Sequence, residues 1–310
     1  MLVIKGIINE NQELNIQLYF YVCEIYEEEL KKHCMRYTKN QVEPDFTDQE
    51  LITTYLFSVA FERRFRIKDI YDYIFHHWLD YFPDLPSYAA YNARLNRLAS
   101  VFPALAQNLQ TKYAADKMGR ESFISLTDSM PIITCSGKRQ GKVARELCDK
   151  GYNSTKNMYY YGVKLHGIGF SKPSSLPVIE ILQVGSAAEH DLSAQRQLLE
   201  QLANRVVFGD KAFCSEAIKQ LFAEFGGELL TPVKYKKGQP SWDKKQRKAF
   251  DDLFSKAVSK IRQPIESFFN WLIEHTDIQR ASKVRSTKGL IVHVFGKIAA
   301  ALILLTDLNI

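Results

Sequence analysis

The sequence predicts a mixed α/β protein in which an all-helical module precedes a mixed sheet flanked by helices. Through the first third of the chain, apolar residues recur at helical spacing without strand-like alternation. From about residue 120, short β-rich runs alternate with helical stretches. We therefore expect two domains, residues 1–115 and 116–310. A chain of 310 residues suits this division, because a single hydrophobic core rarely grows that large.

The composition is that of a folded protein with a mild excess of positive charge. Hydrophobic residues make up 46% and charged residues 25%, which excludes a largely disordered chain. The 41 Lys and Arg outnumber the 35 Asp and Glu, for a net charge of +6, which permits a polyanionic partner without requiring one. The five cysteines include no CxxC pair, so we expect a reducing, cytoplasmic setting rather than a disulfide framework or a zinc module.

Neither end of the chain predicts a membrane partner. The first residues contain no apolar segment of the kind found in a secretory signal. The apolar tail is interrupted by His293 and Lys297, short of the roughly 20 residues that a bilayer span needs. We expect it to form a buried C-terminal helix.

The helical module begins with two helix signals. Thr47, with Glu50 three residues later, forms a capping box ahead of an apolar run. A second run, residues 67–79, repeats apolar residues at helical spacing and is followed by Pro83 and Pro86, which end it.

A third helix is predicted to follow Ser87, which acts as its N-cap. Arg94 and Arg97 lie on this helix among amide side chains. Two helices, a proline turn and a helix with basic residues outline a helix-turn-helix-like module, with Arg94 and Arg97 as DNA contacts. The alternative is an ordinary solvated face.

The second half of the chain predicts the sheet and its flanking helices. The expected strands are residues 123–128, 158–170, 176–184, 205–210 and 227–233. The expected helices are residues 194–203, 212–226 and 246–275, the last with a bend at Pro264.

Two of these strands are predicted to end in an acid. The run FISLTD ends in Asp128, shortly before Pro131, and the run RVVFGD ends in Asp210. Acids at the ends of adjacent strands can converge on one site. Taken alone, Asp128 would be better explained as a turn residue, because Asp readily bonds backbone amides where a strand ends.

The long helix offers a third acid, Glu266, four residues after Arg262 on the same helical face. As an isolated pair they would form a surface salt bridge worth less than about 1 kcal/mol. Together with the two aspartates, Glu266 completes a set of three carboxylates, which suits two Mg²⁺ ions because hard oxygen ligands leave coordination positions open for water and phosphate.

An ordered set of motifs resembles the insertion-sequence DDE transposases, specifically the nine-eight-two family. The motifs span residues 45–290 and are LPSYAAYNARLNRLA, TDSMPI, DKGYNSTKNMYYYGVKLH, VVFGDKAF and RQPIESFFNWL. The resemblance implies an RNase H-like catalytic domain acting on double-stranded DNA. It also implies Asp128, Asp210 and Glu266 as the acidic triad, with Mg²⁺ as the cofactor and Mn²⁺ as its substitute.

The chain departs from that family at two positions. Related transposases often carry Tyr three residues before the arginine and Lys seven residues after the glutamate, where this chain has Ser259 and Ile273. Any role of those side chains falls to others, such as Arg280 or Lys283, or is absent.

Further candidate DNA contacts lie outside the acid site. Lys164 and His166 share a strand face, and the resemblance implies phosphate contact near the metals; a solvated lysine and a core histidine are equally good interpretations. The basic run 234–248 is expected to form a DNA-binding loop, in which Trp242 stacks on an unpaired base. Its other candidate contacts are Lys236, Lys237, Lys244, Lys245 and Arg247.

We expect a bacterial, nucleoid-associated transposase that cleaves at the ends of its insertion sequence and joins the freed 3′ ends to target DNA. Arg262 would orient Glu266 or contact phosphate. Cutting two ends together predicts a homodimer or larger synaptic assembly. The alternatives are an RNase H-like nuclease without strand transfer and an inactive DNA-binding relative.

Overall fold

The structure is a computed structural model that describes nine stretches of the chain. They are residues 10–34, 44–117, 123–138, 141–153, 156–172, 175–187, 202–214, 216–235 and 241–306. Two compact units result: a helical unit, Met1–Thr111 with Leu272–Ile310, and a sheet unit, Lys112–Trp271. The expected boundary at residue 115 lies close to the first break, but the expected second domain differs because residues 272–310 group with the helices.

The helical unit is arranged around α2 (Asp48–Ala60), which is buried along nearly its whole length. The Tyr55 hydroxyl on α2 donates to the carbonyl oxygen of Val292 at 3.3 Å. A Cβ atom at Gly296 would lie 2.6 Å from the Tyr55 ring, so glycine allows this close approach. These contacts explain why the C-terminal segment belongs to the helical unit.

The other elements of the helical unit surround α2. They are α1 (Glu10–Ile25), η1 (Tyr26–Leu30), η2 (Lys31–His33), α3 (Ile67–His77), α4 (Tyr88–Arg97), η3 (Leu98–Ser100), α5 (Val101–Lys117, whose last turns enter the sheet unit), α9 (Thr287–Ile291), η6 (Val292–Gly296) and α10 (Lys297–Leu305).

Both predicted helix caps are confirmed. The hydroxyl of Thr47 accepts from the N–H of Glu50, and the Glu50 carboxylate accepts from the N–H of Thr47, which is the reciprocal capping box. Ser87 caps α4 through the N–H of Ala90. The connection between α3 and α4 runs from residue 78 to 87, longer than the turn of three or four residues typical of a helix-turn-helix. The helix-turn-helix-like part of the prediction therefore stays a prediction.

The helical stretch Thr287–Leu305 is long and apolar enough to cross a membrane by length and composition, with a mean hydropathy of 1.9. In the structure, 61% of this segment is buried inside the protein, as a core helix would be. The ammonium of Lys297, 2% exposed, donates to the carbonyl oxygen of Asp277 at 3.1 Å and lies 5.6 Å from the Phe65 ring. The interior of the helical unit thus contains a buried cation.

The sheet unit contains six described strands in one mixed sheet. They are β1 (Ile124–Ser136), β2 (Asp149–Asn153), β3 (Met158–Phe170), β4 (Val178–Ser186), β5 (Val206–Phe208) and β6 (Glu228–Leu230). The order is β2-β3-β1-β5-β6, with β4 also paired to β3. β3 runs antiparallel to β1, β2 and β4, whereas β5 runs parallel to β1 and β6. This mixed α/β arrangement is compatible with the RNase H-like fold expected above.

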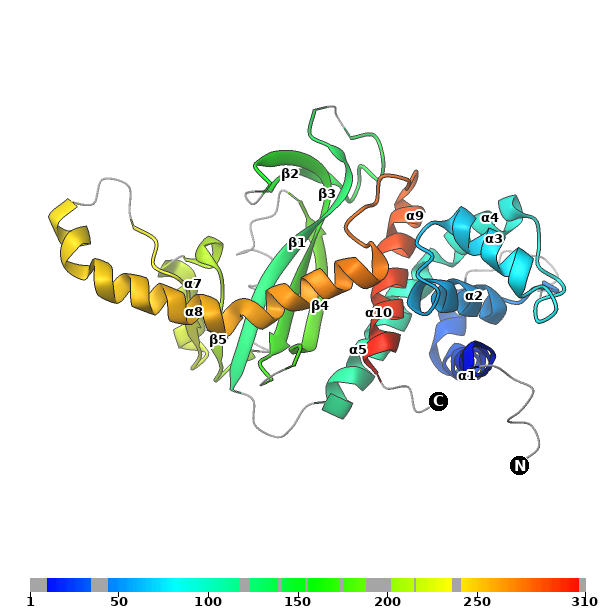
Figure 1. The fold of residues 1–310 in the computed structure, drawn as a ribbon, viewed down its shortest axis with the longest axis horizontal. Helices are drawn as coiled ribbons and strands as arrows, with labels where there is room; N and C mark the ends of the chain where they lie inside the picture. The colour runs from blue at the N-terminus through cyan, green and yellow to red at the C-terminus, as the bar shows by residue number, and fades with distance from the viewer. Residues whose placement is uncertain are drawn as a thin grey trace. The chain divides into compact units, whose positions relative to one another are not determined.

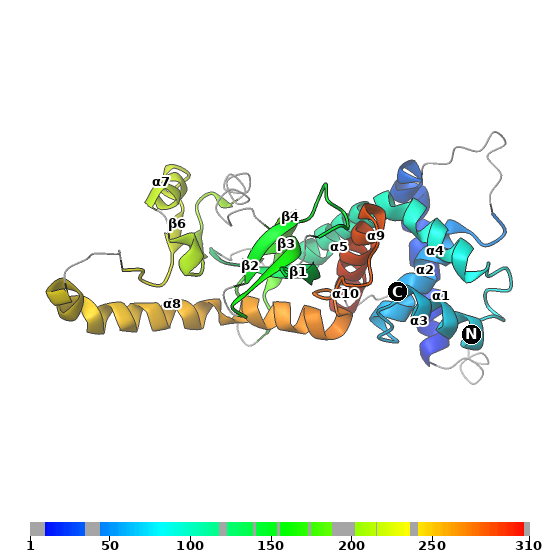
Figure 2. The same cartoon turned by 90° about the horizontal axis from the view of Figure 1, so that it is seen from above.

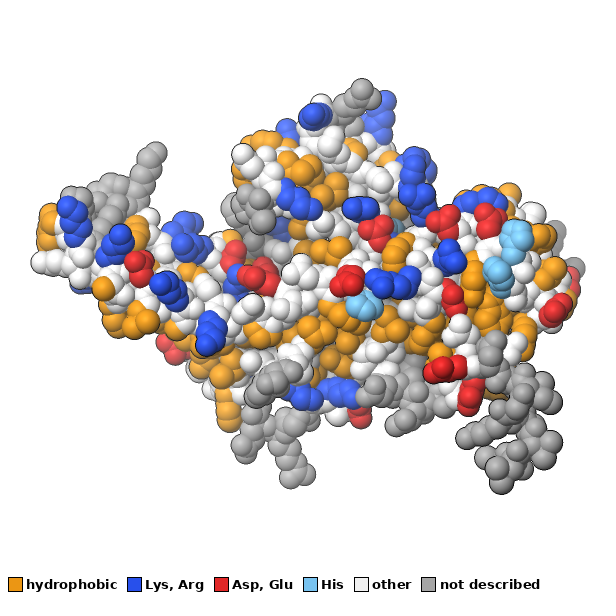
Figure 3. Space-filling view, in the orientation of Figure 1, with side chains coloured by type: hydrophobic (Ala, Val, Ile, Leu, Met, Phe, Trp, Pro, Cys, Tyr) orange, Lys and Arg blue, Asp and Glu red, His pale blue; other side chains and the backbone are white. Residues whose placement is uncertain are grey.

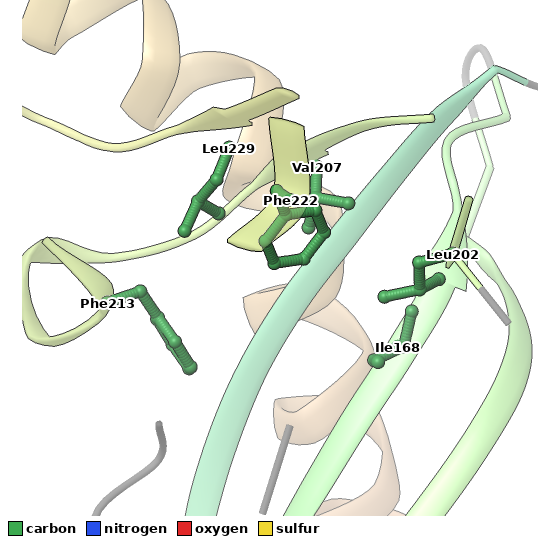
Figure 4. Close-up of a cluster of buried hydrophobic side chains, with 6 residues drawn as sticks. All are labelled: Ile168, Leu202, Val207, Phe213, Phe222 and Leu229. Atoms are coloured by element: carbon green, nitrogen blue, oxygen red, sulfur yellow. The ribbon is translucent and has the colours of Figure 1, made fainter. Parts of the chain in front are cut away.

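Helices cover both faces of this sheet. On one face lies the long helix α8 (Ser241–Thr276); both views draw it alongside the sheet (Figure 1 and Figure 2). A Cβ atom at Gly167 of β3 would lie 2.9 Å from the ring of Phe269 on α8, which shows how closely the helix packs there. On the other face, α7 (Glu216–Glu224) packs against the sheet. Figure 4 shows the buried cluster on that side, formed by Ile168, Leu202, Val207, Phe213, Phe222 and Leu229.

The strands differ from the prediction at β1 and β2. β1 does not end at Asp128 but continues through Pro131 to Ser136. Because β5 pairs with β1 only over Ile124–Leu126, Pro131 lies where β3 is the only paired neighbour among the described strands, and proline is tolerated at such an edge. β2 was not predicted, and most of the helix predicted at residues 194–203 lies outside the described residues.

The helix α8 is longer than predicted, because the basic run that we expected as a loop supplies its first two turns. Residues 241–248 include several good helix formers, which favour this start. Pro264 lies inside the helix, and α8 changes direction in its middle (Figure 1), as expected where a proline removes a backbone hydrogen bond.

Candidate active site

Asp128 lies on the face of β1 that α8 covers. It pairs with Gly167 on β3, and side chains that pair directly share a face of the sheet. Gly167 faces Phe269 of α8, so Asp128 faces the same helix. The side chain of Asp128 is 20% exposed. An acid in the middle of a strand, beside a packed helix, is therefore held between two rigid elements.

Asp210 follows the end of β5, next to β1. The parallel register pairs Leu126 with Phe208, and each aspartate comes two residues later in its own strand direction. The carboxylate of Asp210 accepts from the N–H of Ala212 at 2.6 Å and so caps the short helix η5 (Lys211–Phe213). Asp210 is partly exposed and lies at the same level of the sheet as Asp128.

Arg262 joins the acids of the strand and the helix. Its Nη1 lies 2.9 Å from Oδ2 of Asp128, and its Nη2 donates to Oε1 of Glu266 one turn later on α8. The side chain of Arg262 is 12% exposed, whereas that of Glu266 is 48% exposed. One guanidinium therefore brings two of the predicted acids together at an edge that remains open to solvent.

The charges around the site act on the pKa of the Asp128 carboxyl. Burial raises the pKa of its carboxyl to about 6, while Arg262 and a hydrogen bond from the N–H of Ser129 (2.8 Å) act to lower the pKa. The negative charges of Asp210 and Glu266 raise it further, so both are close enough to act on Asp128. The site thus holds more acids than cations.

The donor atoms present fit a hard divalent cation. Three carboxylates from two strands and a helix supply the oxygen ligands that such ions prefer, in a setting where negative charge is in excess. Within the part of the chain that the structure describes, no three His, Cys, Asp or Glu side chains are yet grouped closely enough to hold a metal ion. Instead, the guanidinium of Arg262 lies between Asp128 and Glu266.

Lys164 and His166 do not face this site. They pair with Pro131 and Ser129, whose side chains alternate with that of Asp128 and lie on the opposite face of the sheet. His166 is buried, 1% exposed. The strand register places these side chains on the far face from the acids, and their contact with phosphate stays a prediction. The interpretation of His166 as a core residue fits better.

The two arginines of α4 differ in their surroundings. Arg94 forms a 2.9 Å ion pair with Asp48 and is 14% exposed; it also donates to the carbonyl oxygen of Phe46. These contacts give Arg94 a structural role in the helical unit, and its predicted DNA contact stays a prediction. Arg97 is exposed, and its DNA contact stays a prediction.

Within the basic run 234–248, the side chains that the structure describes are exposed. Trp242 is 65% exposed, but it lies on the first turn of the helix rather than on a loop. Lys245 and Arg247 are exposed on the same helix. Lys236 and Lys237 lie outside the described residues, and Lys244 is described only as part of the helix. The DNA contacts of this segment stay predictions.

Sequence reasoning missed Gly167, which lies directly opposite Asp128. Lacking a side chain, it lets Phe269 of α8 approach the sheet. The available signal was the pair of glycines in the apolar run HGIG, since glycine inside a strand often marks a close approach of another element.

Comparison with known proteins adds an independent observation. A family model described as "Transposase DDE domain" matches residues 123–303, more than half of the chain, and includes all three acids and Arg262. No curated protein and no solved structure gave a significant match.

Proposed function

Because the chain belongs to the transposase DDE domain family, we propose that it is an insertion-sequence transposase of the nine-eight-two type. It cleaves DNA at the ends of its own element and joins the freed 3′ ends to target DNA. The observation that carries this proposal is the bridge from Asp128 through Arg262 to Glu266, with the charge of Asp210 acting on the same carboxylate.

The three carboxylates Asp128, Asp210 and Glu266 would hold Mg²⁺, with Mn²⁺ as a substitute. Bound there, the ions would activate the attacking oxygen and stabilise the leaving oxygen of the phosphodiester. Arg262 is the positioning residue: its guanidinium favours the ionised form of Asp128 and holds Glu266 beside the strand.

DNA would be bound by surfaces on both units. In the sheet unit, Trp242, Lys245 and Arg247 are exposed on α8 and carry the chemistry for phosphate contact and base stacking. In the helical unit, Arg97 is the exposed basic side chain of α4. Two element ends must be cut together, so the active species would be a homodimer or larger assembly on DNA.

The test is metal-dependent cleavage of DNA that carries the element ends, followed by joining to a supercoiled plasmid. We expect cleavage with Mg²⁺ or Mn²⁺ and joined products from the unchanged chain. Asp128→Asn, Asp210→Asn and Glu266→Gln should each abolish cleavage while DNA binding is kept, because only ligand charge is removed. Glu228→Gln, at an exposed acid of the same sheet, is the matched control and should cleave normally.

The outcomes separate the alternatives. Cleavage without joined products would indicate an RNase H-like nuclease instead of a transposase. DNA binding without any metal-dependent cleavage, in the unchanged chain, would indicate an inactive DNA-binding relative. Full activity in Asp128→Asn would remove the assignment of the acid site.

A further inference from the structure

The hairpin of β2 and β3 presents two tyrosine rings to solvent. Tyr152 and Tyr159 pair directly across the two strands, with ring centroids 5.0 Å apart and the ring planes tilted by 54°. They are 50% and 57% exposed. Large rings are costly to leave in water, so a neighbouring exposed pair indicates a surface with a binding partner.

The pair is held in place by its neighbours. The hydroxyl of Tyr152 donates to Oδ1 of Asn157 at 2.5 Å, within the same hairpin. The ammonium of Lys150 lies 4.8 Å from the centre of the Tyr159 ring, a cation–π contact. Rings fixed in advance lose little conformational entropy when a flat partner stacks on them.

The surface around the rings is basic. The N–H of Gly137, just past β1, donates to the carbonyl oxygen of Tyr159 at 2.8 Å, which brings the start of the following segment beside the hairpin. Figure 3 shows Lys and Arg side chains gathered over the end of the sheet formed by β2 and β3. The exposed cations of this segment and of the hairpin are Lys138, Lys142, Arg145, Lys150 and Lys156. Among the described residues of 137–159 the acids are fewer: Glu146 and Asp149, whose carboxylate accepts from the Ser186 hydroxyl at 2.5 Å.

The hairpin lies well away from the acid site along the strands. Tyr159 precedes Gly167, the partner of Asp128, by eight residues on β3. At about 3.3 Å per residue this is roughly 26 Å, or about eight base pairs of duplex at a rise of about 3.4 Å. The hairpin is therefore a separate surface on the sheet unit, and it could touch DNA beyond the cleaved bond.

We propose that the Tyr152–Tyr159 pair and its surrounding cations form a second DNA-contacting surface, which stacks on unpaired bases and neutralises the adjoining phosphates. The occupant follows from charge complementarity and ring chemistry, because cations recognise any phosphate backbone and exposed aromatic rings stack on bases that are not paired. This surface rests on the proposed function for its place on the substrate, but its affinity for DNA can be measured without cleavage.

The test measures the affinity of the full chain for labelled single-stranded DNA of about 30 nucleotides and for the matching duplex. We expect the double variant Tyr152→Leu with Tyr159→Leu to weaken single-strand binding by about 10-fold to 100-fold, since stacking is lost, and duplex binding by less than about threefold. The double Tyr→Phe variant keeps the rings and should keep single-strand affinity. Leu147→Ser, which changes a 41% exposed apolar side chain of the same segment, is the matched control and should bind normally.

The cations give a second, independent readout. Replacing Lys138, Lys142 and Lys156 by Ala should reduce the salt dependence of single-strand binding by about two units of slope. The inference is overturned if the Tyr→Leu pair binds single strands normally, or if it loses duplex affinity to the same extent. Thermal unfolding of each variant shows whether a loss of binding reflects a loss of fold. If the double variant Tyr152→Leu with Tyr159→Leu is destabilised, the single variant Tyr159→Leu is measured in its place.

Failure of this inference can be told apart from failure of the proposed function. If the unchanged chain cleaves DNA but the tyrosine variants bind normally, only the hairpin surface is wrong. If the unchanged chain does not cleave but the tyrosine variants lose single-strand affinity, the hairpin binds DNA and the proposed transposase mechanism is wrong. If the proposed function and the hairpin surface are both correct, the tyrosine variants should cleave at the normal rate once DNA is saturating, because the hairpin does not touch the acids.

Discussion

Arg94 of the helical unit and Arg262 of the sheet unit each form a 2.9 Å ion pair with an aspartate, and their side chains are 14% and 12% exposed. Their neighbours differ. Asp48, the partner of Arg94, is nearly buried and also accepts from the hydroxyl of Tyr26 at 3.1 Å. Arg94 itself lies 5.7 Å from the Phe46 ring and donates to the carbonyl oxygen of that residue. One cation is matched by one acid.

Around Arg262 the charges do not balance. A single guanidinium contacts Asp128 and Glu266, and the charge of Asp210 also reaches Asp128. Glu266 is half exposed, so the cluster opens to solvent. Ion pairs of equal length and with similarly buried arginines thus differ in their surroundings: the Arg94 pair is balanced and closed, whereas the surplus acid around Arg262 lies at an edge open to solvent and is suited to a further cation.

The largest effect is expected where the balanced pair is broken. Asp48→Asn leaves the Arg94 guanidinium without its acid in a largely buried position, and we expect a loss of about 3–5 kcal/mol in the free energy of unfolding. Urea unfolding measures it. Asp45→Asn, at a neighbouring exposed acid, is the control. A loss below about 1 kcal/mol would mean that the Arg94 pair is no more structural than a surface pair.

A smaller effect is expected at the buried cation that has no ion-paired acid among the described contacts. Burial lowers the pKa of Lys297 to about 7 from 10.5. Between those values the unfolded chain binds more protons than the folded chain, so stability rises with pH through this window and the penalty is complete below pH 7. We expect the free energy of unfolding to rise by about 3 kcal/mol from pH 7 to about pH 9.5 through this group.

Lys297→Met removes the titrating group and keeps a long side chain. The variant should lack that rise, while the other lysines and tyrosines titrate alike in both proteins. Urea unfolding at several pH values gives the comparison. If the free energy of unfolding depends on pH in the same way in both proteins, burial does not lower the pKa of Lys297.

At the unbalanced site, the effect should fall on activity instead of stability. Arg262→Gln removes the cation that holds Asp128 and Glu266 together, and we expect cleavage to slow by about 100-fold. The free energy of unfolding should fall by less than in Asp48→Asn, because Glu266 is half exposed and the Asp128 carboxyl, whose pKa burial raises to about 6, can take up a proton. A large loss of stability with normal cleavage would show that Arg262, like Arg94, has a structural role only.

The smallest effect is expected at the exposed indole. Trp242→Ala should weaken DNA binding by roughly 1–3 kcal/mol, if the ring stacks on a base, and should leave the free protein nearly as stable as before. DNA affinity and thermal unfolding are measured side by side, with Phe250→Ala, another exposed ring on α8, as the control. Unchanged affinity with a destabilised protein would place Trp242 in the core.

Local chemistry explains which of these features could be predicted from the sequence. The capping box at Thr47 and the strand that carries Asp128 depend on neighbours within a few residues, although the strand continues past Asp128, where the sequence predicted its end. The partner of Arg94 could not be predicted, because Asp48 lies 46 residues earlier and only packing brings them together. The face of His166 depended on strand register, where one residue decides between two sides of the sheet.

Gly167 has no functional group, but it lies on β3 directly opposite Asp128 and leaves the space that the tip of the Phe269 ring of α8 occupies. An added methyl would meet the tip of the Phe269 ring at 2.9 Å, so the ring would have to shift, and a larger side chain would displace it further. In a saturation mutagenesis screen for transposition, tolerance at position 167 should therefore decline with side-chain volume and be indifferent to charge or polarity. The acids should show the reverse dependence, so the screen would distinguish a spacer from a ligand without any structure.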